Sequence, residues 1–160
     1  MKIVLFFFFV ILFLNTRGQT TIHKFSEIIS AKVGVPTGLF SSVYSFTAGG
    51  SAGAKYSLSD QSSLSGTIGF QQFFRKGGGE GISFVPVMGG FQYHFIPEAF
   101  ISFEAGMAIP TYANGGIVGS IIPAFGYQIN RHLSADLNYT GFAQYGFLVG
   151  GINTRLSYSF

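Results

Sequence analysis

Five charged residues occupy the polar positions of segments in which apolar and polar residues alternate: Lys32, Lys55, Glu104, Asp136 and Arg155. Successive side chains of a strand point to opposite faces, so these five would lie on the polar faces of their strands. Three cations and two anions can form ion pairs, and an unpaired charge held away from water is costly. We therefore expect a structural network of ion pairs inside the fold. The functional alternative is a narrow path for ions.

A histidine and a serine two residues apart, His132 and Ser134, have the chemistry of a base and a nucleophile on one strand face. Such a base needs a carboxylate that orients it, and only Asp136 follows the pair in the sequence. The chain has no cysteine and its three histidines are scattered, so the ligands of a typical metal site are missing. The sequence therefore predicts no catalytic site, no metal site and no cofactor.

Eight strand-like segments would position these side chains. In the clearest segment, Ile101, Phe103 and Met107 alternate with Ser102 and Glu104. The expected strands are 27–36, 43–58, 63–74, 82–95, 99–109, 117–129, 133–142 and a last strand that ends at residue 160. Three short turns, near 59–62, 96–98 and 130–132, alternate with four longer loops, at 38–42, 75–81, 110–116 and 143–146.

The composition indicates that these strands span a membrane. Charged residues make up 9% of the chain, against about 25% in a typical soluble domain, and aromatic residues make up 18%. After residue 14 no run approaches the roughly 20 apolar residues that a spanning helix needs. A closed barrel also spans a membrane, because its backbone groups pair between strands. We therefore predict an all-β protein, an eight-stranded antiparallel up-and-down transmembrane β-barrel.

The first 18 residues are expected to be a signal peptide that is removed. Lys2 precedes an apolar run over 3–14, and the small residues Thr16 and Gly18 stand before the cleavage point. We then expect a periplasmic lead-in over 19–26 and an outer-membrane barrel domain over 27–160. Without Lys2 and Arg17, nine basic residues become seven against six acidic ones. That balance provides no basic patch for a nucleic-acid partner.

Aromatic residues gather at the ends of the expected strands, as they do where side chains anchor a barrel at both membrane interfaces. At the end expected to face the periplasm they are Tyr56, Tyr93, Phe95, Tyr127, Tyr158 and Phe160. At the outer end they are Tyr44, Phe46, Phe74, Phe84, Tyr112, Phe142, Tyr145 and Phe147. We expect two aromatic girdles around an aliphatic band.

Four motifs carry a resemblance to a known family: Gly34-Val35-Pro36, Gly69-Phe70-Gln71-Gln72-Phe73, the run from Val85 to Phe95, and Arg155 to Phe160. With them the chain resembles the small outer-membrane β-barrel domain family common in Bacteroidota, over residues 27–160. In architecture it is also similar to OmpX-type barrels and to the OmpA membrane domain. The resemblance implies the cell outer membrane of a Gram-negative bacterium and two periplasmic termini. It brings no catalytic residues.

The partners implied are outer-membrane lipids and the barrel-assembly machinery, which would read the carboxy-terminal strand through Tyr158 and Phe160. We expect a structural or interaction protein of the envelope and not an enzyme. One alternative is a narrow channel for ions or small solutes. A second is a secreted, lipocalin-like barrel whose apolar face turns inward to bind lipid.

Overall fold

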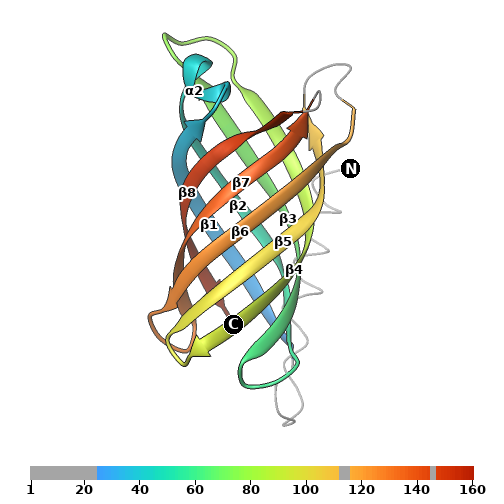
Figure 1. Ribbon diagram of the computed structural model, residues 1–160, viewed down its shortest axis with the longest axis vertical. Helices are drawn as coiled ribbons and strands as arrows, with labels where there is room; N and C mark the ends of the chain where they lie inside the picture. Colours follow the sequence, from blue (N-terminus) through green and yellow to red (C-terminus); the bar gives the residue numbers. More distant parts are fainter. Residues whose placement is uncertain (1–24, 112–115, 145–146) are drawn as a thin grey trace, which may run out of the picture.

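Eight antiparallel strands close into a barrel in the computed structural model, which describes residues 25–111, 116–144 and 147–160 (Figure 1). The elements are β1 (Phe25–Thr37), α2 (Phe40–Val43), β2 (Tyr44–Ser57), β3 (Ser62–Arg75), β4 (Ile82–Ile96), β5 (Ala99–Pro110), β6 (Val118–Gln128), β7 (Leu133–Gln144) and β8 (Phe147–Ser159). Each strand pairs with the next, and β8 pairs with β1. Closure leaves no strand edge with unpaired backbone groups. The predicted fold class is confirmed.

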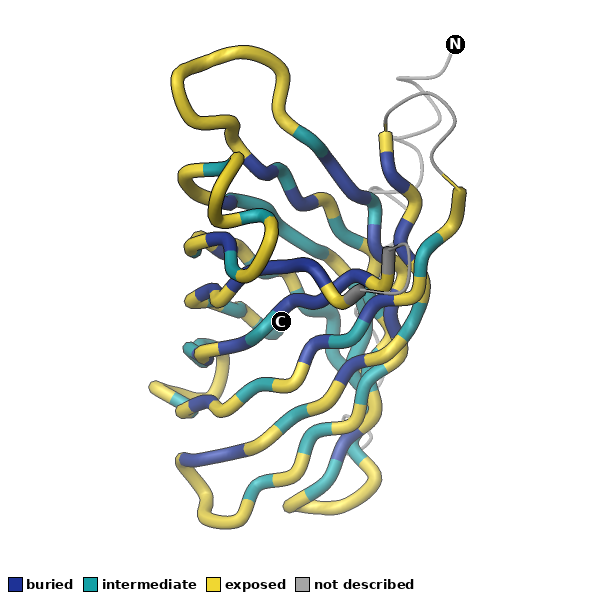
Figure 2. The backbone as a smooth tube through the Cα atoms, turned by 45° about the horizontal axis from the view of Figure 1, so that its top comes forward, coloured by how far each residue is buried: buried dark blue, intermediate teal, exposed yellow. Residues whose placement is uncertain are grey.

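Alternation along the strands separates an apolar outer surface from a polar interior. In β5, Ile101, Phe103 and Met107 are 51%, 51% and 58% exposed, whereas Glu104 and Ala108, at the alternate positions, are buried. More exposed and less exposed residues alternate in a similar way along β3, β6 and β8, whereas most of β2 has intermediate burial (Figure 2). The apolar face therefore points outward, which is the reverse of the lipocalin-like alternative.

The two ends of the barrel differ in their connections. The turns 58–61, 97–98 and 129–132 lie at the end that also holds the carboxy terminus, which we call the C-terminal end. The helix α2 and the hairpin 76–81 lie at the opposite end, which we call the α2 end (Figure 1). Gly77, Gly78 and Gly79 turn the hairpin with positive φ angles, a conformation that other residues adopt only with strain.

Most strand ends move by one or two residues from the prediction, and three differences are the clearest. A helical turn, α2, replaces part of the loop expected at 38–42. β1 begins at Phe25, which pairs with Tyr56 of β2. β7 and β8 pair as far as Gln144 and Phe147, so the loop expected at 143–146 shortens to 145–146, outside the described residues. The expected signal peptide also lies outside them. No helix among the described residues is long and apolar enough to span a membrane.

Outward aromatic pairs lie at both ends of the barrel. At the C-terminal end, Tyr158 and Phe160 have ring centroids 4.9 Å apart. At the α2 end, the rings of Phe46 and Phe74 stack at 4.2 Å. The prediction was wrong for Phe84 and Phe142, which point into the barrel, and for Tyr44, whose ring packs against the inward Phe73. Of the other expected residues, 112 and 145 and the side chain of 147 lie outside the described part.

Candidate functional site

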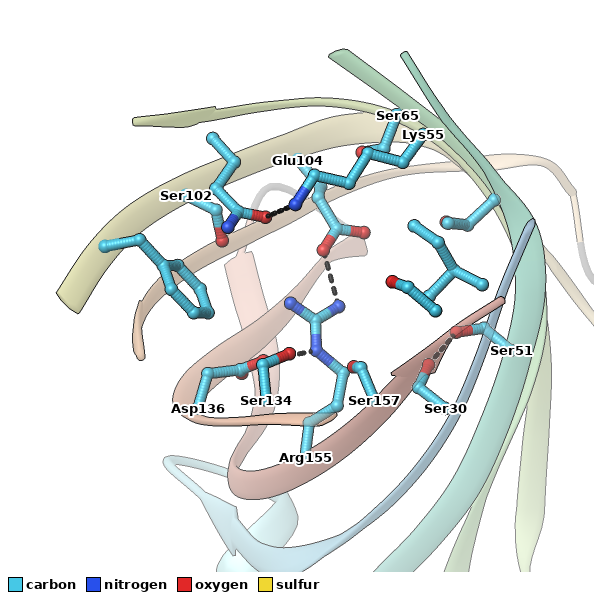
Figure 3. Close-up of a pocket in the computed structure, with 15 residues that line it drawn as sticks. Ser30, Ser51, Lys55, Ser65, Ser102, Glu104, Ser134, Asp136, Arg155 and Ser157 are labelled. Atoms are coloured by element: carbon cyan, nitrogen blue, oxygen red, sulfur yellow. Dashed lines mark hydrogen bonds and ion pairs between the residues drawn. The ribbon is translucent and has the colours of Figure 1, made fainter. Parts of the chain in front are cut away.

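Arg155 holds an ion cluster together at the centre of the barrel. Its Nη1 donates to Glu104 Oε1 at 2.5 Å, and its Nε donates to Asp136 Oδ2 at 2.8 Å (Figure 3). Asp136 is the cross-strand neighbour of Arg155 on β7, whereas Glu104 reaches it from β5. Both carboxylates are buried. The cluster therefore ties strands that do not pair with each other, and charge-assisted bonds of this kind are the strong ones.

A missing side chain makes room for this cluster. Gly90 on β4 is the register partner of Glu104. A Cβ atom at Gly90 would lie 2.6 Å from Ser65 Oγ and 2.8 Å from Glu104 Cγ. Because both distances are shorter than real contacts, the glycine leaves the space that the carboxylate of Glu104 needs to reach Arg155.

Lys32 lies beside the cluster and belongs to a buried hydrogen-bond network. It is the register partner of Arg155 on β1, and its Nζ donates to Thr140 Oγ1 at 3.4 Å. Asn153 Nδ2 donates to the same oxygen at 3.2 Å, and Asn138 Nδ2 donates to Asp136 Oδ1 at 2.8 Å. We call Lys32, Glu104, Asp136 and Arg155 the ion cluster. Buried polar groups that bond to one another in this way avoid the penalty of an unsatisfied donor or acceptor.

Three inward phenylalanines, Phe73, Phe84 and Phe142, form an aromatic layer between this network and the α2 end. All three are fully buried. The rings of Phe84 and Phe142 stack with centroids 4.1 Å apart, and Phe73 meets both edge-on, at 6.0 and 6.2 Å. Phe40 of α2 packs edge-on against Phe73 at 5.0 Å. Helix α2 thus covers the layer, and apolar rings seal this end of the interior.

No family model matches the chain, and a search of the curated proteins finds no match. Among solved structures, the outer membrane protein Ail of Yersinia pestis in a bilayer nanodisc aligns with a TM-score of 0.60 at 9% identity, over 84% of this chain and 99% of Ail. The amino-terminal barrel domain of Pseudomonas aeruginosa OprF also gives 0.60, at 13% identity, over 86% of this chain and 98% of that domain. A de novo designed transmembrane β-barrel gives 0.56 at 18% identity, over 84% and 95%.

This chain has the fold of a transmembrane outer-membrane β-barrel. At these identities the likeness describes the fold, and a designed barrel shares it, so function has to be argued from the residues of this barrel. The resemblance to a Bacteroidota family is not confirmed by these comparisons.

Below the ion cluster, the C-terminal half of the barrel contains a cavity of about 50 Å³. It is lined mainly by hydroxyl groups, with Lys55, Gln92 and the carboxylates of the cluster (Figure 3). The hydroxyl residues are Ser30, Ser51, Ser65, Thr67, Ser102, Ser134, Ser157 and Ser159. Ligand pockets for drug-sized molecules measure about 300–1,000 Å³, so this cavity holds only water or a small ion.

Of the five predicted charged residues, the structure joins Arg155, Glu104 and Asp136 by ion pairs and leaves Lys32 and Lys55 with hydrogen bonds to neutral side chains. Lys55 donates to Gln92 Oε1 at 3.2 Å, and Gln92 Nε2 lies 2.7 Å from His94 Nε2. In the part of the chain that the structure describes, no carboxylate oxygen lies within 4.0 Å of the Lys55 ammonium. Lys55 therefore faces the cavity without a direct ion pair.

His132 and Ser134 do not form a catalytic pair. His132 lies in an exposed turn, where its Nδ1 is 2.8 Å from the backbone oxygen of Ser159 and its ring stacks on Tyr158. Ser134 lines the interior cavity. Among the described residues, no group of three or more histidine, aspartate or glutamate side chains is placed to hold a metal ion. The arrangement supports packing, ion pairing and the binding of small polar species.

Proposed function

We propose that this protein is a non-catalytic integral protein of the bacterial outer membrane, with a structural or interaction role in the envelope. The observation that carries the proposal is the filled interior. The aromatic layer closes the α2 end, and the hydrogen-bond network and ion cluster fill the middle. An eight-stranded barrel is only wide enough for its side chains to fill it, or for one small ligand. The outer apolar surface supports contact with lipids.

We place the C-terminal end in the periplasm and the α2 end outside the cell. Outer-membrane barrels have short periplasmic turns and longer extracellular loops, and the short turns of this chain lie at the C-terminal end. Tyr158 and Phe160 then stand at the periplasmic interface, 41% and 53% exposed on the outer surface. Their position supports recognition of the last strand by the barrel-assembly machinery.

This orientation can be tested with single cysteines, because the natural chain has none. Glu80→Cys places a thiol in the exposed hairpin at the α2 end, and Asp60→Cys places one in an exposed turn at the C-terminal end. On intact cells we expect a polyethylene-glycol maleimide to label the variant at 80 and not the variant at 60. Permeabilising the outer membrane should then expose position 60. Labelling of both variants on intact cells, or of 60 alone, would contradict the proposed orientation.

A narrow channel is the second candidate, favoured by the polar cavity that extends from the C-terminal end to the ion cluster. Its difficulty is the aromatic layer, because ions that reach the cluster would still meet three fully buried rings. Passage would require these rings and the cluster to move apart together.

Single-channel recording separates the two candidates. We expect the folded protein to give no discrete conductance steps in a planar bilayer, since side chains fill the middle of the interior and its α2 end. Folding is checked first by a heat-dependent shift in electrophoretic mobility and by strand-type circular dichroism. Reproducible steps that change in size when Arg155 is replaced with methionine would establish the channel instead.

A further inference from the structure

The cavity below the ion cluster presents hydrogen-bond donors that lack acceptors. The Lys55 ammonium has three N–H groups, and among the described residues one acceptor, Gln92 Oε1, lies within hydrogen-bond distance, at 3.2 Å. Ser102 Oγ is buried, and within the described residues it has no hydrogen-bond partner. Both side chains line the cavity, and Figure 3 shows both turned into it. A buried hydroxyl without a partner is costly, and a hydroxyl can donate or accept. The Lys55 ammonium can only donate, so an occupant that bonds to both groups must accept hydrogen bonds.

The distribution of charge points to an occupant that is negative. Arg155 pairs with both Glu104 and Asp136, whereas among the described residues no carboxylate oxygen lies within 4.0 Å of the Lys32 ammonium. Together with Lys55, these inward side chains carry three positive charges against two negative ones. Lys55 also has no carboxylate oxygen within 4.0 Å among the residues described, and of these two lysines it is the one that lines the cavity. Its strand position, three residues before the short turn 58–61, places it near the C-terminal mouth, where an ion from solution can reach it.

The size of the cavity and its other charges limit the size and charge of an anion that can bind there. A cavity of about 50 Å³ has room for a few water molecules, since one water needs about 10–15 Å³ of such space, and it is too small for a large organic ligand. Glu104 and Asp136 also line the cavity and would repel a multiply charged oxyanion. A single monovalent ion of halide size is therefore the best match.

We propose that this cavity is a binding site for a small monovalent inorganic anion such as chloride, held by Lys55 Nζ and Ser102 Oγ. The anion enters from the C-terminal end and neutralises Lys55. The site adds a counterion to the interior and does not depend on the proposed role of the protein in the envelope.

Chloride-35 NMR tests the site with the folded full-length barrel in a non-ionic detergent. Sodium gluconate keeps the ionic strength constant, since gluconate is too large for the cavity. We expect the protein to broaden the chloride line beyond the effect of empty micelles, and bromide to reverse the broadening. Lys55→Met should remove the protein-specific broadening. Lys76→Met is the matched control, because Lys76 lies at the α2 end and donates to the Ser41 backbone oxygen at 2.7 Å. The Lys76→Met protein should broaden the chloride line as much as the natural protein does.

A second variant keeps the test decisive if Lys55→Met does not fold. Ser102→Ala removes one hydroxyl and leaves the charges unchanged, and it should reduce the broadening severalfold. The proposal is overturned if the natural protein causes no broadening beyond that of micelles, which means that the cavity holds water alone. It is equally overturned if the broadening persists in Lys55→Met or, where that variant does not fold, in Ser102→Ala, which places the chloride on the surface.

Discussion

Replacement of Arg155 with methionine is expected to destabilise the barrel by about 3–5 kcal/mol, because it leaves two buried carboxylates without their cation. Glu104 and Asp136 bond to Arg155 at 2.5 and 2.8 Å, and both are buried. Methionine fills a similar length of the interior, so the loss reflects charge more than volume. The measurement is the free energy of unfolding in urea, with the protein in lipid vesicles and folding followed by electrophoretic mobility.

Two further variants show whether the effect belongs to the cluster. Arg75→Met is the matched control, because Arg75 is exposed at the end of β3, and surface changes of this kind alter stability by less than about 0.5 kcal/mol. Glu104→Gln combined with Arg155→Met should cost less than the sum of the two single changes, by at least about 0.5 kcal/mol, since both remove the same interaction. Strict additivity of the two single changes would show that the two side chains are not coupled.

The strands could be predicted to within one or two residues at most boundaries because alternation carries two kinds of information at once. In segments 99–109 and 133–142 it marks both the element and the face that turns outward, since a strand repeats every two residues. The short helix α2 has no such pattern. Its turn forms next to the aromatic layer, where Phe40 packs on Phe73 of β3, a contact that local sequence does not encode.

The inward phenylalanines show that a position near a strand end does not decide whether an aromatic side chain points outward. Phe84 and Phe142 stand near strand ends, where an aromatic residue is favourable at a membrane interface. Yet Phe142 follows Asp136 by six residues on a regular strand, so the two side chains must share the inner face. A strict two-residue period would have placed Phe142 on the inner face. The stacking of Phe142 on Phe84 joins β7 and β4, two strands that do not pair with each other. The sequence alone therefore does not predict that contact.

The partners of the charged residues are likewise a long-range property. The polar face of each strand was predictable, but the pairing of Arg155 with Asp136 depends on the register between β7 and β8. Glu104 comes from β5 and meets Arg155 only because the barrel closes and Gly90 leaves room. Lys55, on β2, lines the cavity beside the carboxylates without a direct ion pair among the described residues, although its local pattern is like that of the others.

Shortening Phe142 to alanine is expected to destabilise the barrel by about 3–5 kcal/mol, the usual cost of removing a buried phenylalanine ring. The ring is fully buried, stacks on Phe84 at 4.1 Å and touches Phe73 edge-on. Its loss removes the transfer free energy of the ring and also leaves a space that the rigid barrel wall cannot close. The same urea unfolding in vesicles measures the effect.

The outer surface supplies a matched control with the same ring geometry. Phe46 stacks on Phe74 at 4.2 Å, near the same end of the barrel, but it is 47% exposed. Phe46→Ala should lose only the transfer free energy of the ring, about 1.5–3 kcal/mol, because lipid chains fill the space that the ring leaves. Phe142→Ala should therefore cost more than Phe46→Ala. If the two variants lose the same free energy of unfolding, the aromatic layer contributes no packing energy beyond the transfer of the ring. The α2 end of the interior would then be loosely packed and not sealed.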